Sequence, residues 1–222
     1  MQRQYRYLDL LVTIFVVILI VSNLIAPKFV AVGWFRFSAA QLLFPITYIF
    51  GDVFTEVYGY SASRKAIWTG FLGSVIMTAF GLFAIWLPAA PEFQNQRAFE
   101  IVFGGLPRNV AGSLIAYWAG EFANSFTVAK MKIWTGGRWL WTRTVGSTVV
   151  GQLVDTCIVI FFIYLGRQPL GVMAQLIVSG YLFKVTYEVL ATPLTYLVVN
   201  FLKREEDVDF FDRHTNFNPF GA

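Results

Sequence analysis

The stretch YIFGDVFTEVYGYSASRK, residues 48–65, begins as part of an apolar helix and yet carries two acids, Asp52 and Glu56. Because these acids are four residues apart, their side chains lie on the same face of that helix. An ionised carboxylate at the centre of a membrane helix costs about 2.5–3.5 kcal/mol, so such groups face protein or water instead of lipid. The stretch therefore predicts a helix that turns one polar face toward the inside of a helical bundle.

The composition of the whole chain is typical of an integral membrane protein. Of its 222 residues, 57% are hydrophobic and only 14% are charged. One span needs roughly 20 apolar residues, so the chain has room for about six spans. The apolar runs predict spans at residues 8–25, 38–58, 66–87, 107–129, 143–165 and 173–201. We thus expect an all-α membrane protein with six transmembrane helices in one bundle, residues 1–202, and a polar, solvated tail, residues 203–222.

The basic residues predict the orientation of this bundle. Six spans place both termini on one side of the membrane, and eleven basic residues fall on that side: Arg3, Arg6, Arg64, Lys65, Lys130, Lys132, Arg138, Arg143, Lys203, Arg204 and Arg213. The other side has four or five, depending on whether Arg108 is interfacial: Lys28, Arg36, Arg97, Arg167 and Arg108. Since positive residues are retained in the cytoplasm, both termini are expected to be cytoplasmic. These residues are scattered markers of topology and not a patch, so the net charge of +4 does not predict a nucleic-acid partner.

Polar side chains recur at helical spacing in four of the predicted spans. Apart from Lys184, the charged residues at membrane depth are all acids. We expect them to line a polar cavity for a small molecule, formed by Tyr48, Asp52, Glu56, Glu121, Asn124, Gln152, Asp155, Lys184 and Glu188. The alternative is structural: Lys184 pairs with Glu188, one turn away, and the other acids hold helices together through hydrogen bonds. In the fourth span, Gly112, Ala116 and Gly120 form a stripe of small residues that predicts close helix packing.

The sequence does not predict an enzyme, a metal or a cofactor. It lacks the nucleophile, zinc and phosphate-loop motifs, and its single His214 lies in the tail, where we expect a surface residue. The lone Cys157 lies within a span and is expected to be structural. An intramembrane aspartyl hydrolase, in which two acids share a proton, is the sharpest enzymatic alternative, and Gly51-Asp52 superficially resembles such a site.

Four segments resemble the motifs of the queuosine-precursor transporter family: GDVFTEVYGYSASRKAIW, GEFANSF followed by Lys130, GQLVDT, and YLFKVTYEVLATPLTYLV. The resemblance runs in order through all six predicted spans, roughly residues 8–202. The resemblance implies uptake of 7-deazaguanine bases, the cyano- and aminomethyl-substituted precursors of queuosine, across the bacterial cytoplasmic (inner) membrane. It also implies a six-helix fold similar to the substrate-binding components of energy-coupling-factor vitamin transporters.

Those components dock on a partner through small residues of the first helix, whereas the first helix here, LLVTIFVVILIV, is bulky. This favours a carrier that needs no partner protein and is compatible with a monomer, while a docking component stays an alternative. A carboxylate can accept the ring N–H and the exocyclic amine of a guanine-like edge together, and Asp52, Glu121 or Asp155 could fill that role. Tyr48, Tyr117 or Phe183 could stack on the flat base. Facilitated diffusion and proton coupling both fit the sequence.

Overall fold

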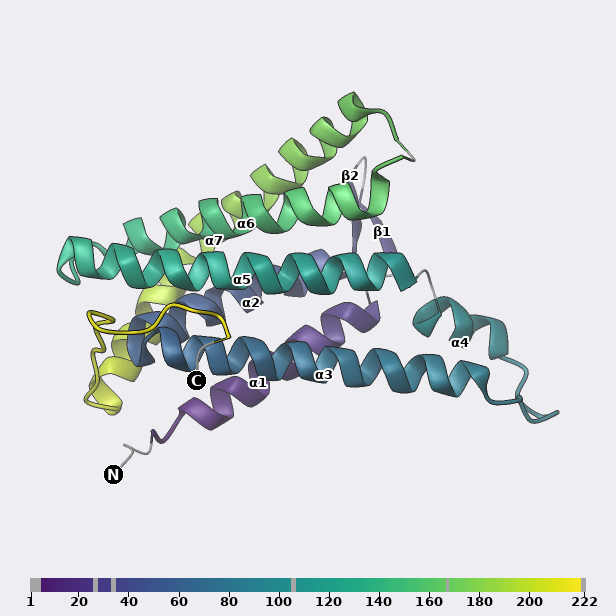
Figure 1. Cartoon of the computed structure of the whole chain (residues 1–222), viewed down its shortest axis with the longest axis horizontal. Helices are drawn as coiled ribbons and strands as arrows, with labels where there is room; N and C mark the ends of the chain where they lie inside the picture. The colour runs from purple at the N-terminus through teal and green to yellow at the C-terminus, as the bar shows by residue number, and fades with distance from the viewer. Residues whose placement is uncertain (1–4, 26–27, 33–34, 105–106, 167, 221–222) are drawn as a thin grey trace.

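The computed structural model describes residues 5–25, 28–32, 35–104, 107–166 and 168–220, so the predicted topology markers Arg3 and Arg167 lie outside the described residues. This part of the chain forms seven α-helices, a π-helical segment and one β-hairpin (Figure 1). In chain order these are α1 (Leu8–Ile25), β1 (Phe29–Val32), β2 (Phe35–Ser38), α2 (Ala40–Val53), η1 (Phe54–Tyr58), α3 (Tyr60–Trp86), α4 (Gln96–Phe103), α5 (Pro107–Thr135), α6 (Leu140–Tyr164) and α7 (Leu170–Glu205).

The count of six helices is not confirmed, although each predicted span coincides with a helix. The additional helix is α4, whose eight residues are too short to cross a membrane. The antiparallel hairpin of β1 and β2, in which Phe29 pairs with Ser38, was not predicted either. By length and apolarity, four described helices can span a membrane: α1, α3, α6 and α7. The other two counterparts, α2 with 14 residues and α5 with 29, are not among them.

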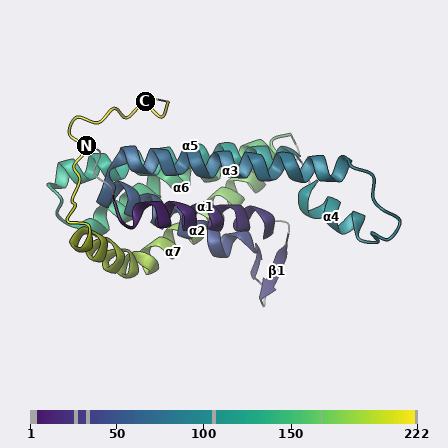
Figure 2. The ribbon, with the colours of Figure 1, turned by 90° about the horizontal axis from the view of Figure 1, so that it is seen from below.

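The helices form a bundle with both chain ends at the same end of the molecule (Figure 1). The start of α3 and the turn between α5 and α6 lie at this end as well, whereas the hairpin, α4 and the turn between α6 and α7 lie at the opposite end. Figure 2 shows α1, α2 and α7 on one side of the bundle and α3 and α5 on the other.

The bundle has an apolar core and an apolar outer surface. Phe15 and Leu19 of α1 pack with Phe54 of η1 and with Val199 and Leu202 of α7, all fully or almost fully buried. Large apolar side chains are exposed on the outside of α3 and α7, including Leu190, which is 77% exposed. Water would strongly disfavour such a surface, whereas lipid does not. The chain is a multi-pass membrane protein.

A π-helical turn follows α2 and ends at a glycine. Every side chain of η1 is buried, and Gly59 then adopts a φ of 87°, which favours a residue without a Cβ. A Cβ at Gly59 would also collide with the ring of Phe210, which comes from the C-terminal tail. Gly59 therefore sets both the turn into α3 and the approach of the tail.

The tail after α7 docks on the bundle, which was not predicted, although much of it, including Asp209 and Phe220, stays exposed. It folds back over α3 and α5 (Figure 2), where the backbone N–H of Tyr60 donates to both carboxylate oxygens of Asp212 at 3.0 and 3.1 Å. The indole of Trp68 donates to the carbonyl oxygen of Pro219 at 2.8 Å. Phe217 and Phe220 pack on aromatic side chains of these helices. The aromatic residues of this otherwise polar segment hold it against the helices. His214 is exposed, as expected.

Candidate functional site

The nine predicted site residues separate into two polar clusters. The inner cluster lies among α2, α5, α6 and α7 and contains eight of them: Tyr48, Asp52, Glu121, Asn124, Gln152, Asp155, Lys184 and Glu188. The Glu56 cluster lies toward the end of the bundle that carries the termini and contains Glu56, Lys132, Arg143, Lys203 and Asp209. The two clusters differ in how completely their polar atoms are paired.

Asp52 is the best connected acid of the inner cluster. It is fully buried, and its Oδ1 accepts hydrogen bonds from Asn124 Nδ2 at 2.8 Å and from Ser147 Oγ at 3.0 Å. Its Oδ2 has no partner among the described residues. The sequence analysis missed Ser147, although it lies four residues before Gly151 and eight before Asp155, on the same face of α6. Asp52 is thus held in place through one oxygen and presents the other.

Three glycines let α2, α5 and α6 approach closely around these acids. A Cβ at Gly51 would lie 2.6 Å from Glu121 Oε2, and one at Gly151 would lie 2.8 Å from the Cβ of Asn124. A Cβ at Gly120 would lie 3.0 Å from the carbonyl oxygen of Gly151. Real Cβ atoms do not approach other atoms so closely without displacing them, which confirms the predicted packing role of Gly120.

Lys184 pairs with Asp155 and not with Glu188, so the structural alternative drawn from the sequence was wrong about its partner. The ammonium donates to Asp155 Oδ2, and it lies 5.6 Å from the ring centroid of Phe44. Glu188 is buried and close enough to Asp52 and Glu121 to interact with them electrostatically. The inner cluster therefore combines four carboxyl groups with one ammonium group.

Most unpartnered polar atoms in the described part of the chain gather in and beside this inner cluster. Apart from the indole nitrogen of Trp118, they are Tyr48 Oη, Asp52 Oδ2, Tyr117 Oη, both Glu121 carboxyl oxygens, Asn124 Oδ1, Thr148 Oγ1, Gln152 Oε1 and Glu188 Oε1. A buried polar atom without a partner costs about 1–3 kcal/mol. So many in one place are typical of a site that binds a polar molecule, because such groups are normally paired. Phe183, by contrast, is 46% exposed on the outside of α7 and does not contribute.

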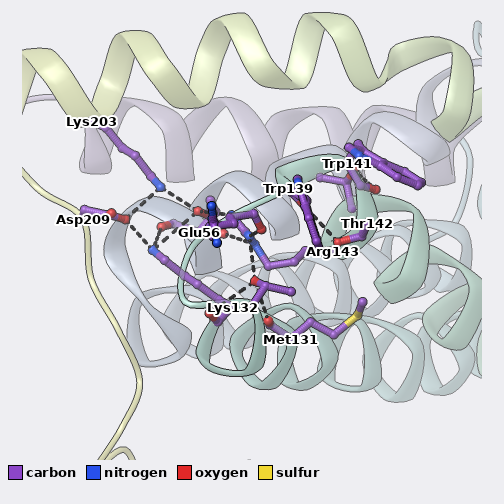
Figure 3. A network of polar contacts seen from close by, with 12 residues as sticks. Glu56, Met131, Lys132, Trp139, Trp141, Thr142, Arg143, Lys203 and Asp209 are labelled. Atoms are coloured by element: carbon purple, nitrogen blue, oxygen red, sulfur yellow. Dashed lines mark hydrogen bonds and ion pairs between the residues drawn. The ribbon is translucent and has the colours of Figure 1, made fainter.

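The Glu56 cluster is fully paired (Figure 3). Arg143 donates from Nε to Glu56 Oε2 at 2.9 Å and from a terminal nitrogen to Oε1 at 2.8 Å, while Lys203 donates to Oε1 at 2.6 Å. Lys132 donates to the backbone carbonyl of Glu56 and to Asp209. Arg143, Lys132 and Lys203 were predicted only as topology markers; the first two are almost completely buried and bind an acid.

Asp209 joins this cluster to the tail. Its carboxylate lies 2.6 Å from the ammonium of Lys132 and 2.8 Å from that of Lys203. Partial burial by itself would raise the pKa of Asp209, but hydrogen bonds from Lys132 and Lys203 outweigh it and lower that pKa below its ordinary value. The carbonyl oxygen of Phe210 accepts a further hydrogen bond from Lys132 at 2.6 Å. The tail is therefore tied to α5 and α7 at the point where Glu56 is held.

Two comparisons with known proteins match this chain. The family described as "putative vitamin uptake transporter" matches residues 38–198, which include the whole inner cluster. A protein of Bacillus subtilis (strain 168) described as "probable queuosine precursor transporter" is 30% identical over 188 residues, covering 83% of this chain and 81% of that protein. No solved structure matches the chain.

Proposed function

Since the chain belongs to the vitamin uptake transporter family, we propose that it imports 7-deazaguanine precursors of queuosine, the cyano- and aminomethyl-substituted bases, into the cytoplasm. The observation that carries this proposal is the inner cluster, in which unpartnered acceptors lie buried among four helices. The resemblance of the four sequence motifs and the description of the Bacillus subtilis relative support the substrate class.

The chemistry of a guanine-like edge fits the acceptors of this cluster. Six of the unpartnered atoms are carboxyl or amide oxygens: Asp52 Oδ2, Glu121 Oε1 and Oε2, Asn124 Oδ1, Gln152 Oε1 and Glu188 Oε1. The ring N–H and the exocyclic amine of the base are donors that one carboxylate can accept together. We propose that Asp52 accepts one of these donors through Oδ2, which has no partner among the described residues, while Asn124 and Ser147 orient the carboxylate through Oδ1.

Two further features fit the rest of such a substrate. The buried rings of Tyr48 and Tyr117 both lie near Phe44 and present flat apolar faces for a planar base. Asp155, which now binds Lys184, offers a carboxylate to an aminomethyl cation, so this substrate would compete with the lysine while the cyano-substituted base would not.

We further propose that the carrier acts without an energy-coupling partner and that its termini are cytoplasmic. The bulky side chains of α1 support the first point. The basic residues gathered at the end of the bundle with both termini support the second (Figure 1). Reporter fusions after Lys65, Arg138 and the last residue should all report a cytoplasmic position. A periplasmic signal at any of these sites would reject this orientation.

The transport proposal is tested in cells that cannot make the precursor but can convert it. Expression of the protein should restore queuosine in tRNA when either base is supplied at low concentration. If queuosine stays absent although the protein is present in the membrane, the proposed function is wrong. Repeating the assay after deletion of the energy-coupling ATPase modules tests autonomy, because dependence on them would favour a docking component.

A further inference from the structure

Glu121 differs from Asp52 and Asp155, the two acids proposed to bind substrate, in that no described residue donates a hydrogen bond to it. Asp52 accepts from Asn124 and Ser147, and Asp155 accepts from Lys184. Glu121 is fully buried, and neither of its carboxyl oxygens has a partner in the described part of the chain. Its Oε2 packs against α2 at Gly51, the residue next to Asp52.

The charged groups around Glu121 do not compensate a negative charge. Helix α2 contributes Asp52 and the hydroxyl of Tyr48, α6 contributes Asp155, and α7 contributes Glu188. Its own helix contributes Tyr117. The charged residues of α3, Arg64 and Lys65, lie at the start of that helix, where Arg64 binds carbonyl groups of the tail. Lys184, the cation of the inner cluster, is engaged by Asp155.

A buried carboxylate with three acids around it and no donor is strongly disfavoured, whereas the neutral acid is tolerated. Glu121 therefore holds a proton in the arrangement seen here. The same group can ionise when water reaches it from one side of the membrane, because water stabilises the charged form. A proton-coupled carrier needs a group that takes up a proton when it is open to one side of the membrane and releases that proton when it is open to the other side.

We propose that Glu121 binds and releases one proton in each transport cycle, so that uptake is proton-coupled symport. This inference rests on the proposed function, because it assigns the energy source of that same site. The balance is simple: the carboxylic acid forms by taking a proton on the outer side, and the carboxylate is left when that proton enters the cytoplasm with the substrate. Asp52 and Asp155 bind substrate in this scheme, and Glu121 couples it to the gradient.

Purified protein in liposomes, with the membrane potential clamped at zero, tests this with the neutral 7-cyano-7-deazaguanine as probe. An inward gradient of one pH unit, acid outside, should drive about tenfold accumulation if one proton moves with each substrate. Glu121→Gln should lose the response to the gradient, so that its accumulation of substrate is the same with and without the pH difference. Glu92→Gln, a matched change at an exposed glutamate outside the cluster, should behave like the parent.

The outcomes separate the two proposals. A parent protein that exchanges substrate but does not respond to the pH gradient overturns proton coupling and leaves the transport function standing. Gradient-driven accumulation by Glu121→Gln overturns the role of Glu121. If Glu121→Gln folds but no longer binds the probe, Glu121 is a binding residue and the inference is equally overturned; if that variant does not fold, Glu121→Asp must retain coupled uptake. A parent that neither binds nor exchanges the probe rejects the proposed function itself.

Discussion

Asp52, near the end of α2, and Glu56, in the π-helical segment η1 that follows, lie only four residues apart, and yet their surroundings are opposite. Both oxygens of Glu56 are bound by cations, from Arg143 and Lys203, with Lys132 3.5 Å away. Among the described residues, one oxygen of Asp52 has no partner, and neither oxygen of Glu121, an acid of the same cluster, has one. A surplus of donors makes a buried acid a structural element, whereas a surplus of acceptors leaves it free to recognise a ligand.

The register of α6 creates this difference. Arg143 and Ser147 are one turn apart on α6 and bind Glu56 and Asp52, respectively. An arginine can saturate a carboxylate with two parallel hydrogen bonds, while a serine hydroxyl donates only one. Helix α6 thus helps to neutralise Glu56 fully near the end of the bundle, whereas one turn deeper it donates only a single hydrogen bond to Asp52.

The largest expected effect is the loss of stability on removing Glu56. Glu56→Gln leaves the buried guanidinium of Arg143 without a carboxylate, and breaking a buried ion pair in this way costs about 3–5 kcal/mol. Thermal unfolding of the purified protein should show a strongly lowered midpoint and reduced abundance in the membrane. Asp52→Asn, the matched change one turn away, should leave the midpoint close to that of the parent. Equal stability of Glu56→Gln and parent would show that the paired cluster is not structural.

The next effect concerns binding by the inner cluster. Asn nearly preserves the volume of Asp but presents an N–H group where a substrate donor needs an acceptor, and each such mismatch costs about 1–3 kcal/mol. Asp52→Asn or Asp155→Asn should therefore weaken binding of 7-deazaguanines by roughly five- to 150-fold at normal membrane abundance. If both well-folded variants bind as tightly as the parent, the substrate site lies elsewhere.

Lys184 provides a sharper test of the same cluster, because it binds Asp155 alone among the acids. Lys184→Met should weaken binding of the cyano-substituted base by about tenfold, since Asp155 then loses the donor that orients it. A double-mutant cycle measures how far the two side chains act together. Lys184→Met combined with Asp155→Asn should weaken substrate binding no more than the more affected single variant does. Strictly additive losses would mean that the two residues act separately.

The inner cluster was largely predictable because helical spacing is a local property of the sequence. The recurrence of Tyr48, Asp52 and Glu56, and of Gln152 and Asp155, marks buried faces without any knowledge of the partner helices. The separation of Glu56 from the rest was not predictable. A basic residue near a span end, such as Arg143 or Lys132, has the same sequence context whether it faces headgroups or a buried acid, and only the packing of α2 against α6 and α5 decides between them.

The elements that escaped prediction depend on contacts or on weak local patterns. The short helix α4 and the strands β1 and β2 have no long apolar run that would distinguish them from loops. The docking of the tail depends on Phe210 meeting Gly59 and on Asp212 meeting the first N–H of α3, contacts between residues about 150 positions apart. Single aromatic residues in a polar segment do not reveal such distant partners.

The smallest expected effect distinguishes the buried part of the Glu56 cluster from its exposed edge. Asp209 binds Lys132 and Lys203, but its side chain is 48% exposed, so water and salt weaken these pairs, and Asp209→Asn should lower the free energy of unfolding by less than about 1 kcal/mol. Because the pKa of Asp209 is lowered in the folded protein, its contribution is complete above the ordinary Asp pKa of about 3.9 and disappears as the pH falls through the lower folded value. The difference in unfolding midpoint between parent and Asp209→Asn should therefore be constant near neutral pH, shrink below about pH 4 and decrease with added salt. A difference that persists unchanged in strong acid would show that the asparagine acts by disturbing the tail and not by removing a charge.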